Sequence, residues 1–274
     1  MQTLAAAQPL QPKRPRMKTA VITGSASGIG AAVQRQFAEA GMNVIGVDIA
    51  RADVCADLSS AAGREAAIDA VLARSGGVID ALVCCAGLGP QAEPATLVAS
   101  VNYFGTLALL DGLFEALKRG SKPAAVAVSS NSAVLQPWAG HPLHDAYLED
   151  DEARVHALVE ASPADQAGYA AYASSKHALA VAVRRRAASW GRAGVRLNAV
   201  APGAVQTPLL EAGLRDARYG EAIRQFVPPV GRRAEPDEIA SLIHYVCGEQ
   251  AGFIHGSVLF IDGGHDASVR PDAF

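Results

Sequence analysis

The stretch Lys18-Thr-Ala-Val-Ile-Thr-Gly-Ser-Ala-Ser-Gly-Ile-Gly30 decides the fold, because a short apolar strand runs directly into a glycine-rich turn. A helical pattern follows and continues to Ala40. Glycines in such a turn let the backbone bend sharply and approach a diphosphate closely, and the first N–H groups and the dipole of the helix favour an anion. The predicted cofactor loop therefore comprises Gly24, Ser27, Gly28, Ile29 and Gly30.

The next predicted strand, residues 43–47, ends in Asp48, which lies 24 residues after Gly24. A dinucleotide-binding fold carries an acidic residue at about that distance, where it accepts hydrogen bonds from the ribose hydroxyls. A carboxylate there would repel a 2′-phosphate, so the sequence favours NAD over NADP. The alternative is a glycine-rich connection with an incidental aspartate.

Strands and helices alternate along the rest of the chain. This alternation is typical of an α/β fold in which a doubly wound parallel sheet has helices on both faces. Such sheets bind ligands outside the carboxyl ends of their strands. Strands are predicted at 78–83, 124–128, 194–200 and 257–261, and helices at 66–73, 98–118, 153–161 and 236–247.

Composition limits the classes of function. The chain has 274 residues, half of them hydrophobic, and a formal charge of −3, which gives no reason to expect nucleic acid. It contains neither a run of about 20 apolar residues that could cross a membrane nor the apolar block of a secretory signal, so we expect a cytoplasmic protein. Residues 1–16 are predicted to be a disordered extension and 17–274 a single catalytic domain. The four cysteines and the pair His141 and His144 lack the spacing of a metal site, and no disulfide is expected.

Tyr172-Ala-Ser-Ser-Lys176 places a phenol and an ammonium four residues apart in a helical context, and therefore on one helix face. A tyrosine titrates near 10, and a nearby lysine can stabilise its phenolate form. The alternative is a solvated helix with a chance spacing.

Ser129 and Ser130 follow the predicted strand 124–128 and could either polarise a substrate oxygen or make a local turn. Asn102 lies in the predicted helix 98–118, where a buried amide is usually satisfied structurally.

Together these residues resemble the short-chain dehydrogenase/reductase family. The resemblance covers residues 18–264 and implies a Rossmann-type fold. It rests on Thr23-Gly-x-x-x-Gly-x-Gly30, Cys84-Cys-Ala-Gly87, Asn102, Ser129-Ser130, Tyr172-x-x-x-Lys176, Pro202-Gly203 with Thr207, and Asp262-Gly-Gly264. More narrowly, the segments 86–91, 100–105, 227–236 and 262–271 resemble the bacterial 3α-hydroxysteroid dehydrogenase/carbonyl reductase branch.

The resemblance implies reversible hydride transfer between a secondary alcohol and the nicotinamide of NAD. Tyr172 would exchange the hydroxyl proton, Ser130 would hold the substrate oxygen, Lys176 would stabilise the phenolate and bond the nicotinamide ribose, and Asn102 would fix a water. Ser130 is preferred to Ser129 because the family places its active serine second. Further implied cofactor contacts are Asp57, Leu58, Ala86, Gly87, Pro202, Gly203, Val205 and Thr207, although Thr207-Pro208 could be only a turn.

Two features bear on the substrate. Family members usually place the serine about a dozen residues before the tyrosine, but Ser130 and Tyr172 are 42 apart, so a small helical insertion is expected at about 132–168. Apolar residues in 209–230 suit a mobile lid. We therefore expect a small apolar alcohol or ketone, a class that includes steroids, as substrate. The alternatives are a smaller alcohol or dihydrodiol, or a non-catalytic NAD-binding sensor. A homodimer or homotetramer is expected, with the insertion making the ordinary tetramer doubtful.

Overall fold

The computed structural model describes residues 16–138 and 140–273. Its centre is a seven-stranded sheet of order β3-β2-β1-β4-β5-β6-β7 in which every neighbouring pair is parallel. The strands are β1 Thr19–Thr23, β2 Asn43–Asp48, β3 Val54–Cys55, β4 Ala81–Cys84, β5 Ala124–Val128, β6 Arg196–Pro202 and β7 Val258–Ile261. The predicted α/β fold is confirmed. Since all strands point the same way, their carboxyl ends meet at one edge.

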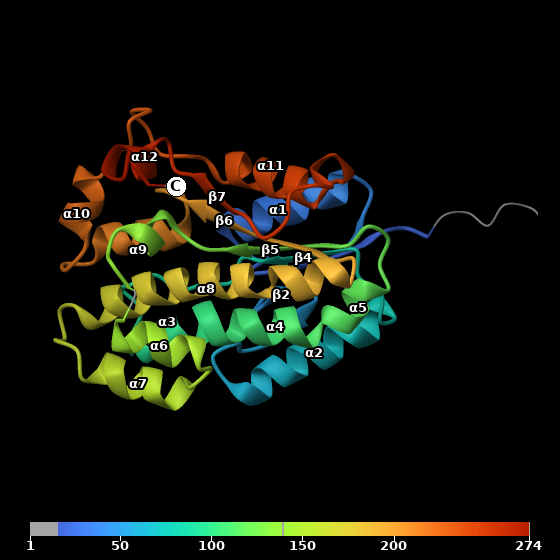
Figure 1. The fold of residues 1–274 in the computed structure, drawn as a ribbon, viewed down its shortest axis with the longest axis horizontal. Helices are drawn as coiled ribbons and strands as arrows, with labels where there is room; N and C mark the ends of the chain where they lie inside the picture. The colour runs from blue at the N-terminus through green and yellow to red at the C-terminus, as the bar shows by residue number, and fades with distance from the viewer. Residues whose placement is uncertain (1–15, 139, 274) are drawn as a thin grey trace, which may run out of the picture.

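Helices cover both faces of the sheet (Figure 1). One face is covered by α1 Gly28–Glu39 and α11 Pro236–Cys247, and the other by α2 Ala61–Ser75, α4 Thr106–Gly112 and α8 Ala167–Arg192. Alternate residues of β1 belong to different cores: Ala20 and Ile22 pack on the α1 side, whereas Val21 packs on the α8 side. This is the expected result for a strand buried on both faces.

The predicted helix 98–118 is not continuous. It consists of α3 Thr96–Ala99, a π-helical segment at Ser100–Gly105, α4, and α5 Phe114–Lys118. The prediction of one helix was therefore wrong, because hydrophobic periodicity does not register a widened turn. A π-helical turn is uncommon and is frequently found at functional sites. Here it contains Asn102.

The segment between Ser130 and α8 folds as two short helices, α6 Pro142–Leu148 and α7 Glu152–Glu160, after a 3₁₀ turn at Asn131–Val134. The side chain of Asp151 accepts a hydrogen bond from the N–H of Arg154 and so caps α7. Tyr147 of α6 is fully buried, with its ring centroid 4.9 Å from that of Tyr103. The expected helical insertion is thus packed on the main body. The predicted lid region holds α9 Pro208–Arg215 and α10 Gly220–Gln225, and the chain continues through a 3₁₀ turn at Glu249–Ala251 to α12 His265–Val269.

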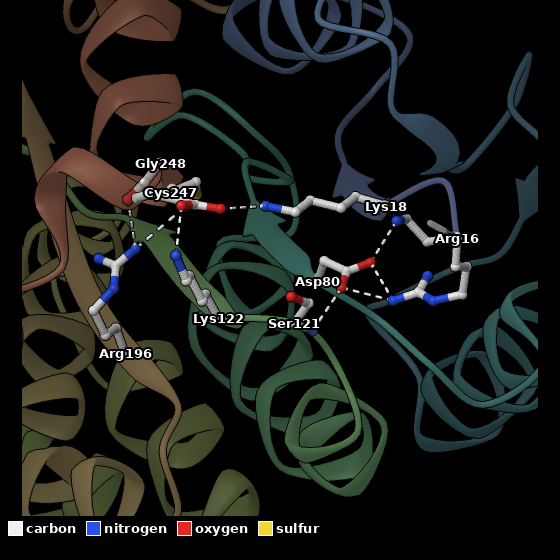
Figure 2. Close-up of polar contacts among 10 residues, drawn as sticks. Arg16, Lys18, Asp80, Ser121, Lys122, Arg196, Cys247 and Gly248 are labelled. Carbon is white, nitrogen blue, oxygen red and sulfur yellow. Dashed lines mark hydrogen bonds and ion pairs between the residues drawn. The ribbon is translucent and has the colours of Figure 1, made fainter. Parts of the chain in front are cut away.

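Ion pairs hold together the edge of the sheet at the amino ends of the strands (Figure 2). The buried carboxylate of Asp80 accepts hydrogen bonds from the backbone N–H groups of Thr19 and Ser121 and from the guanidinium of Arg16. Glu249 pairs with Lys18 and Lys122. The ion pair with Asp80 shows that Arg16, the last residue of the predicted extension, contacts the main body, and the rest of that extension lies outside the described residues. Among the described helices, none has the length and hydropathy needed to cross a membrane.

Candidate active site

The glycine-rich turn joins β1 to α1 at the carboxyl edge of the sheet. Gly24 and Gly28 have φ values of +67° and +52°, which side chains rarely adopt. A Cβ on Gly24 would lie 2.8 Å from the backbone nitrogen of Ala86, and one on Gly30 would overlap the carbonyl of Gly24. The N–H of Ala86 also donates a 3.0 Å hydrogen bond to the Thr23 hydroxyl. The turn therefore packs directly on the segment after β4.

Two further residues of this turn were predicted to contact the cofactor. Ser27 has extended backbone and precedes the first residue of α1, and Ile29 is half-buried in the first turn of that helix. Both lie at the helix N-terminus, where free N–H groups can receive a diphosphate. The predicted arrangement of strand, glycine turn and helix is present.

Asp48 ends β2 beside this turn. Its carboxylate accepts hydrogen bonds from the N–H of Ala26, at 2.9 Å, and from the N–H of Ile49, at 2.7 Å. The first of these bonds fixes the carboxylate against the glycine-rich turn. A hydrogen-bond acceptor is thus held one strand away from the glycine-rich turn. This position fits the adenosine ribose of a dinucleotide whose diphosphate lies at that turn.

Asp57 and Leu58 lie one strand farther out, after β3. The Asp57 carboxylate accepts a 2.9 Å hydrogen bond from the N–H of Ser59, and hydrogen bonds with Ser59 hold the pKa of Asp57 below its usual value. Leu58 is buried against the π-helical segment, since a Cβ on Gly105 would lie 3.0 Å from the Leu58 carbonyl oxygen. The three predicted cofactor segments follow three neighbouring strands in order: the glycine-rich turn follows β1, Asp48 ends β2, and Asp57-Leu58 follows β3.

Asn102 is fully buried, and its amide is satisfied by one neighbour. It accepts from the N–H of Leu88 at 2.7 Å and donates to the Leu88 carbonyl at 3.0 Å. A Cβ on Gly87 would lie 3.2 Å from Asn102 Oδ1 and 3.5 Å from Lys176 Nζ. Gly87 therefore lies between Asn102 and Lys176. The Asn102 amide is therefore satisfied by backbone groups, as the sequence allowed. Its predicted contact with a water stays a prediction.

Ser129 and Ser130 follow β5 and point their hydroxyls to different partners. Ser129 Oγ donates a 2.8 Å hydrogen bond to the backbone carbonyl of Lys176. Ser130 Oγ accepts from the N–H and the hydroxyl of Ser132, at 3.2 and 3.0 Å, and so caps the 3₁₀ turn. It also lies beside the Tyr172 hydroxyl. This arrangement favours Ser130 over Ser129 for contact with a substrate.

Tyr172 and Lys176 lie one turn apart on α8. Lys176 is buried, and its ammonium donates a 2.8 Å hydrogen bond to the Val128 carbonyl. Burial lowers the pKa of Lys176 to about 8. Burial raises the pKa of Tyr172, and the adjacent Ser130 hydroxyl opposes that rise. Burial thus shifts the phenol toward its neutral form in this structure, and stabilisation of the phenolate by Lys176 stays a prediction.

The nicotinamide side of the predicted site is formed by the segment after β6. Pro202 is the last residue of β6, and a Cβ on Gly203 would lie 2.9 Å from Cα of Asp262. Val205 is buried and forms an isolated parallel bridge with Ala234. This segment is thereby held against the ends of β7 and α11.

Thr207 lies opposite the glycine-rich turn, since a Cβ on Gly28 would lie 3.2 Å from Thr207 Cγ2. Its hydroxyl accepts from the N–H of Leu210 and donates to the Val205 carbonyl, both at 3.2 Å, so it caps α9. Thr207-Pro208 is therefore the start of a helix and not the simple turn that the sequence offered as an alternative. A contact with the carboxamide stays a prediction.

Cys84 is the last residue of β4, and Cys85 follows it. Burial raises the pKa of Cys84 to about 12, and the pKa of Cys85 is raised further by the same cause. Both are therefore protonated thiols at neutral pH and poor nucleophiles. Within the described residues no group of His, Cys, Asp and Glu side chains could hold a metal ion.

One contributor to the site was missed in the sequence. Arg64, in the first turn of α2, is buried and donates a 2.8 Å hydrogen bond to the Leu58 carbonyl. Its sequence context is an ordinary amphipathic helix with no motif. Only the tertiary structure brings it to the predicted cofactor segment.

The chain has relatives of known activity. Residues 24–266 match the family described as Enoyl-(Acyl carrier protein) reductase. The chain is 52% identical to the 3-alpha-hydroxysteroid dehydrogenase/carbonyl reductase of Comamonas testosteroni, over 94% of this chain and 100% of that protein. It is 32% identical to the D-threitol dehydrogenase of Mycolicibacterium smegmatis, over 90% and 92% of the two chains.

A solved structure agrees with this relationship. The 3-alpha-hydroxysteroid dehydrogenase of Pseudomonas sp. B-0831, in complex with NADH, superposes with a TM-score of 0.91 at 54% identity, covering 94% of this chain and 100% of that one. The fold, the order of motifs and these similarities agree over nearly the whole chain. The chain therefore belongs to the short-chain dehydrogenase/reductase family.

Proposed function

We propose that the protein is an NAD-dependent oxidoreductase that interconverts a secondary alcohol and a ketone, with 3α-hydroxysteroids and related carbonyl compounds as substrates. The observation that carries this proposal is the juxtaposition of Ser130, Tyr172 and Lys176 at the carboxyl edge of the sheet, in a chain 52% identical to a 3-alpha-hydroxysteroid dehydrogenase/carbonyl reductase.

The residues at the edge of the sheet fit NAD. The backbone cradle of Gly24, Gly28 and Gly30 would take the diphosphate at the N-terminus of α1. Asp48 would accept from the adenosine ribose and repel a 2′-phosphate. Asp57 and Leu58, one strand farther out, would lie beside the adenine. Ala86, Gly87 and the segment 202–207 complete the predicted contacts. NAD would supply a hydride acceptor at the nicotinamide C4.

Tyr172 would act as the acid or base on the substrate hydroxyl. In alcohol oxidation it would take the hydroxyl proton, while Ser130 donates a hydrogen bond to the same oxygen. Its raised pKa means that it needs additional positive charge to lose its own proton. That charge would come from Lys176 and from the oxidised nicotinamide ring. Asn102 would hold the backbone of Leu88 in place, on the side of Gly87 that faces away from Lys176.

The lid supports an apolar substrate. Leu209 of α9 and Val227 and Val230, which follow α10, are exposed large hydrophobic residues. Gln91, after β4, donates to the Leu209 carbonyl at 3.4 Å, so the lid contacts the strand end next to the site. Apolar side chains there suit a steroid or another hydrophobic ketone better than a polyol.

The second candidate is a dehydrogenase of smaller alcohols, favoured by the similarity to the D-threitol dehydrogenase of Mycolicibacterium smegmatis. A sensor that binds NAD without catalysis is a further alternative, but it gives no reason for the polar triad to be intact. NADH absorbance during incubation with NAD and 3α-, 3β-, 7α-, 17β- and 20-hydroxysteroids, beside small secondary alcohols, separates these cases. Turnover of 3α-hydroxysteroids is expected. Activity confined to small alcohols would contradict the steroid assignment, and no activity with any alcohol or ketone would favour the sensor.

The assembly is part of the same proposal. A homo-oligomer is expected, and sedimentation of the purified protein would distinguish a dimer from a tetramer. The burial of Tyr147 against Tyr103 means that the insertion covers part of the helical surface formed by the π-helical segment. This coverage is the reason to doubt the ordinary tetramer, and both a homodimer and a homotetramer remain outcomes of the measurement.

A further inference from the structure

Arg64 connects three parts of the chain through its guanidinium group. Its Nε donates to the Leu58 carbonyl at 2.8 Å, and its Nη2 donates to the carbonyls of Ser59, at 3.1 Å, and Ser100, at 3.0 Å. Its two terminal nitrogens each donate a 2.7 Å hydrogen bond to the carboxylate of Glu152. The side chain is only 9% exposed. The planar fork of arginine suits such a multiple contact, and lysine could not reproduce it.

Glu152 is the first residue of α7 and belongs to the insertion. Burial opposes its ionisation, but the hydrogen bonds and the charge of Arg64 outweigh this effect, so the pKa of Glu152 lies below its usual value. His156, one turn later, has Nε2 2.8 Å from Ser100 Oγ. Helix α7 thus contacts the start of the π-helical segment both through Arg64 and directly.

The carbonyls that Arg64 holds belong to the predicted adenine segment. Leu58 and Ser59 follow Asp57 directly, and Leu58 also packs over Gly105. Three backbone carbonyls accept hydrogen bonds from the guanidinium but carry no net charge. The carboxylate of Glu152 therefore supplies the negative charge that compensates the buried positive charge of Arg64. Removing one partner of a buried ion pair leaves the other uncompensated. Arg64 would then move toward water, and its bonds to Leu58 and Ser59 would lengthen.

We propose that Arg64 and Glu152 form a positioning pair through which the insertion sets the affinity for the adenine end of the cofactor. Neither residue touches the reacting atoms. The inference rests on the proposed function, since it assigns Asp57 and Leu58 to NAD.

The direct test is Glu152→Gln, which keeps the size of the side chain and one acceptor oxygen but removes the charge. The dissociation constants of NADH and of AMP are measured by fluorescence and calorimetry, together with kcat at saturating NAD and the melting temperature. Since coupling through such a network changes binding by about 0.5 to 2 kcal/mol, we expect both dissociation constants to rise by about two- to thirtyfold and by the same factor. The kcat value should stay within about twofold of wild type.

Glu149→Gln is the matched control. Glu149 pairs with Arg154 inside the same insertion, but this pair is exposed. Among the described residues, neither side chain forms a hydrogen bond with Leu58 or Ser59. It should leave both dissociation constants unchanged. Arg64→Lys provides a second variant if Glu152→Gln unfolds at the assay temperature. It should also raise the dissociation constants of NADH and AMP.

Three results would overturn the inference. One is a lower melting temperature with unchanged NADH and AMP binding, which would leave the pair a purely structural role. The second is a loss of kcat with unchanged affinity. The third is equal weakening in Glu149→Gln. If wild-type protein itself fails to bind NADH, the proposed function fails instead, so the two failures are distinguishable.

Discussion

The hydroxyl of Ser129 donates a 2.8 Å hydrogen bond to the backbone carbonyl of Lys176, and so joins the end of β5 to the helix that carries Tyr172. The ammonium of Lys176 makes a second link by donating to the Val128 carbonyl, also at 2.8 Å. These two bonds fix α8 against the carboxyl end of β5. Ser130, the next residue, is left to face Tyr172.

Substitution of the two serines should therefore have different consequences. Ser130→Ala removes the donor to the substrate oxygen and should lower kcat by about 10²- to 10³-fold, while the NADH dissociation constant changes little. Ser129→Ala removes a buried structural bond and should lower the free energy of unfolding by about 1 kcal/mol, with a smaller loss of kcat. Steady-state kinetics and urea unfolding of both variants measure this. A larger loss of kcat in Ser129→Ala than in Ser130→Ala would reverse the assignment.

Asp48 should determine the preference for NAD. Asp48→Ala removes the carboxylate that is held by the N–H of Ala26, and with it the repulsion of a 2′-phosphate. The ratio of kcat/KM with NAD to that with NADP should fall by at least about tenfold, since one charged hydrogen bond contributes about 1.5 to 3 kcal/mol. Asp53→Ala is a matched control, because the Asp53 carboxylate accepts from the N–H of Gly46 in β2 and not from the backbone of the glycine-rich turn. An unchanged ratio in Asp48→Ala would show that another residue discriminates.

Gly24→Ala should abolish NADH binding. The added Cβ would lie 2.8 Å from the backbone nitrogen of Ala86 at a residue whose φ is +67°, so the turn must move. Gly41→Ala is the control: its φ is +79°, but a Cβ there meets nothing within 4 Å. It should cost stability through backbone strain without changing affinity. Calorimetric titration with NADH compares the two, and wild-type affinity in Gly24→Ala would contradict the proposed cradle.

High pH should destabilise the folded protein through buried tyrosines. Burial raises the pKa of Tyr103 to about 12 and raises the pKa of Tyr147 as well. A folded-state pKa above the unfolded value contributes stability that is fully present below pH 10 and is lost as pH rises from there through the folded-state values. The free energy of unfolding in urea should thus fall between pH 10 and about 12.

Tyr147→Phe tests this pH dependence, because it removes the titrating hydroxyl, whose hydrogen bond to the Ala171 carbonyl is long at 3.4 Å. The variant should lose less stability than wild type over the same pH interval. Tyr245→Phe, at an exposed position, should behave as wild type. Equal slopes in Tyr147→Phe and wild type would show that Tyr147 does not contribute.

The parts of the fold that the sequence predicted are those governed by local pattern. Buried strands such as Ala124–Val128 are short apolar runs, and the helix Pro236–Cys247 begins with a proline and has a regular apolar face. Their bounds were predicted to the residue. The glycine-rich turn was equally evident, because φ values of +67° and +52° require glycine in practice.

The parts that were missed depend on contacts distant in sequence. The π-helical segment around Asn102 is associated with the Leu88 backbone and with the packing of Leu58 on Gly105, and neither is visible in the periodicity of 98–118. Arg64 and Glu152 are 88 residues apart. Each lies just before a predicted helix, 66–73 or 153–161, where it looks like an ordinary surface charge. For the same reason the raised pKa of Tyr172 could not be foreseen, because it follows from burial and not from the spacing to Lys176.

The most direct measurement is the effect of Tyr172→Phe on turnover and on cofactor affinity in the same preparation. This substitution removes only the hydroxyl that would exchange the substrate proton. Oxidation of a 3α-hydroxysteroid, followed through NADH absorbance, should fall by about 10²- to 10⁴-fold, while the NADH dissociation constant stays within about twofold of wild type. Wild-type turnover in Tyr172→Phe would contradict the proposal that Tyr172 is the acid and base of the reaction.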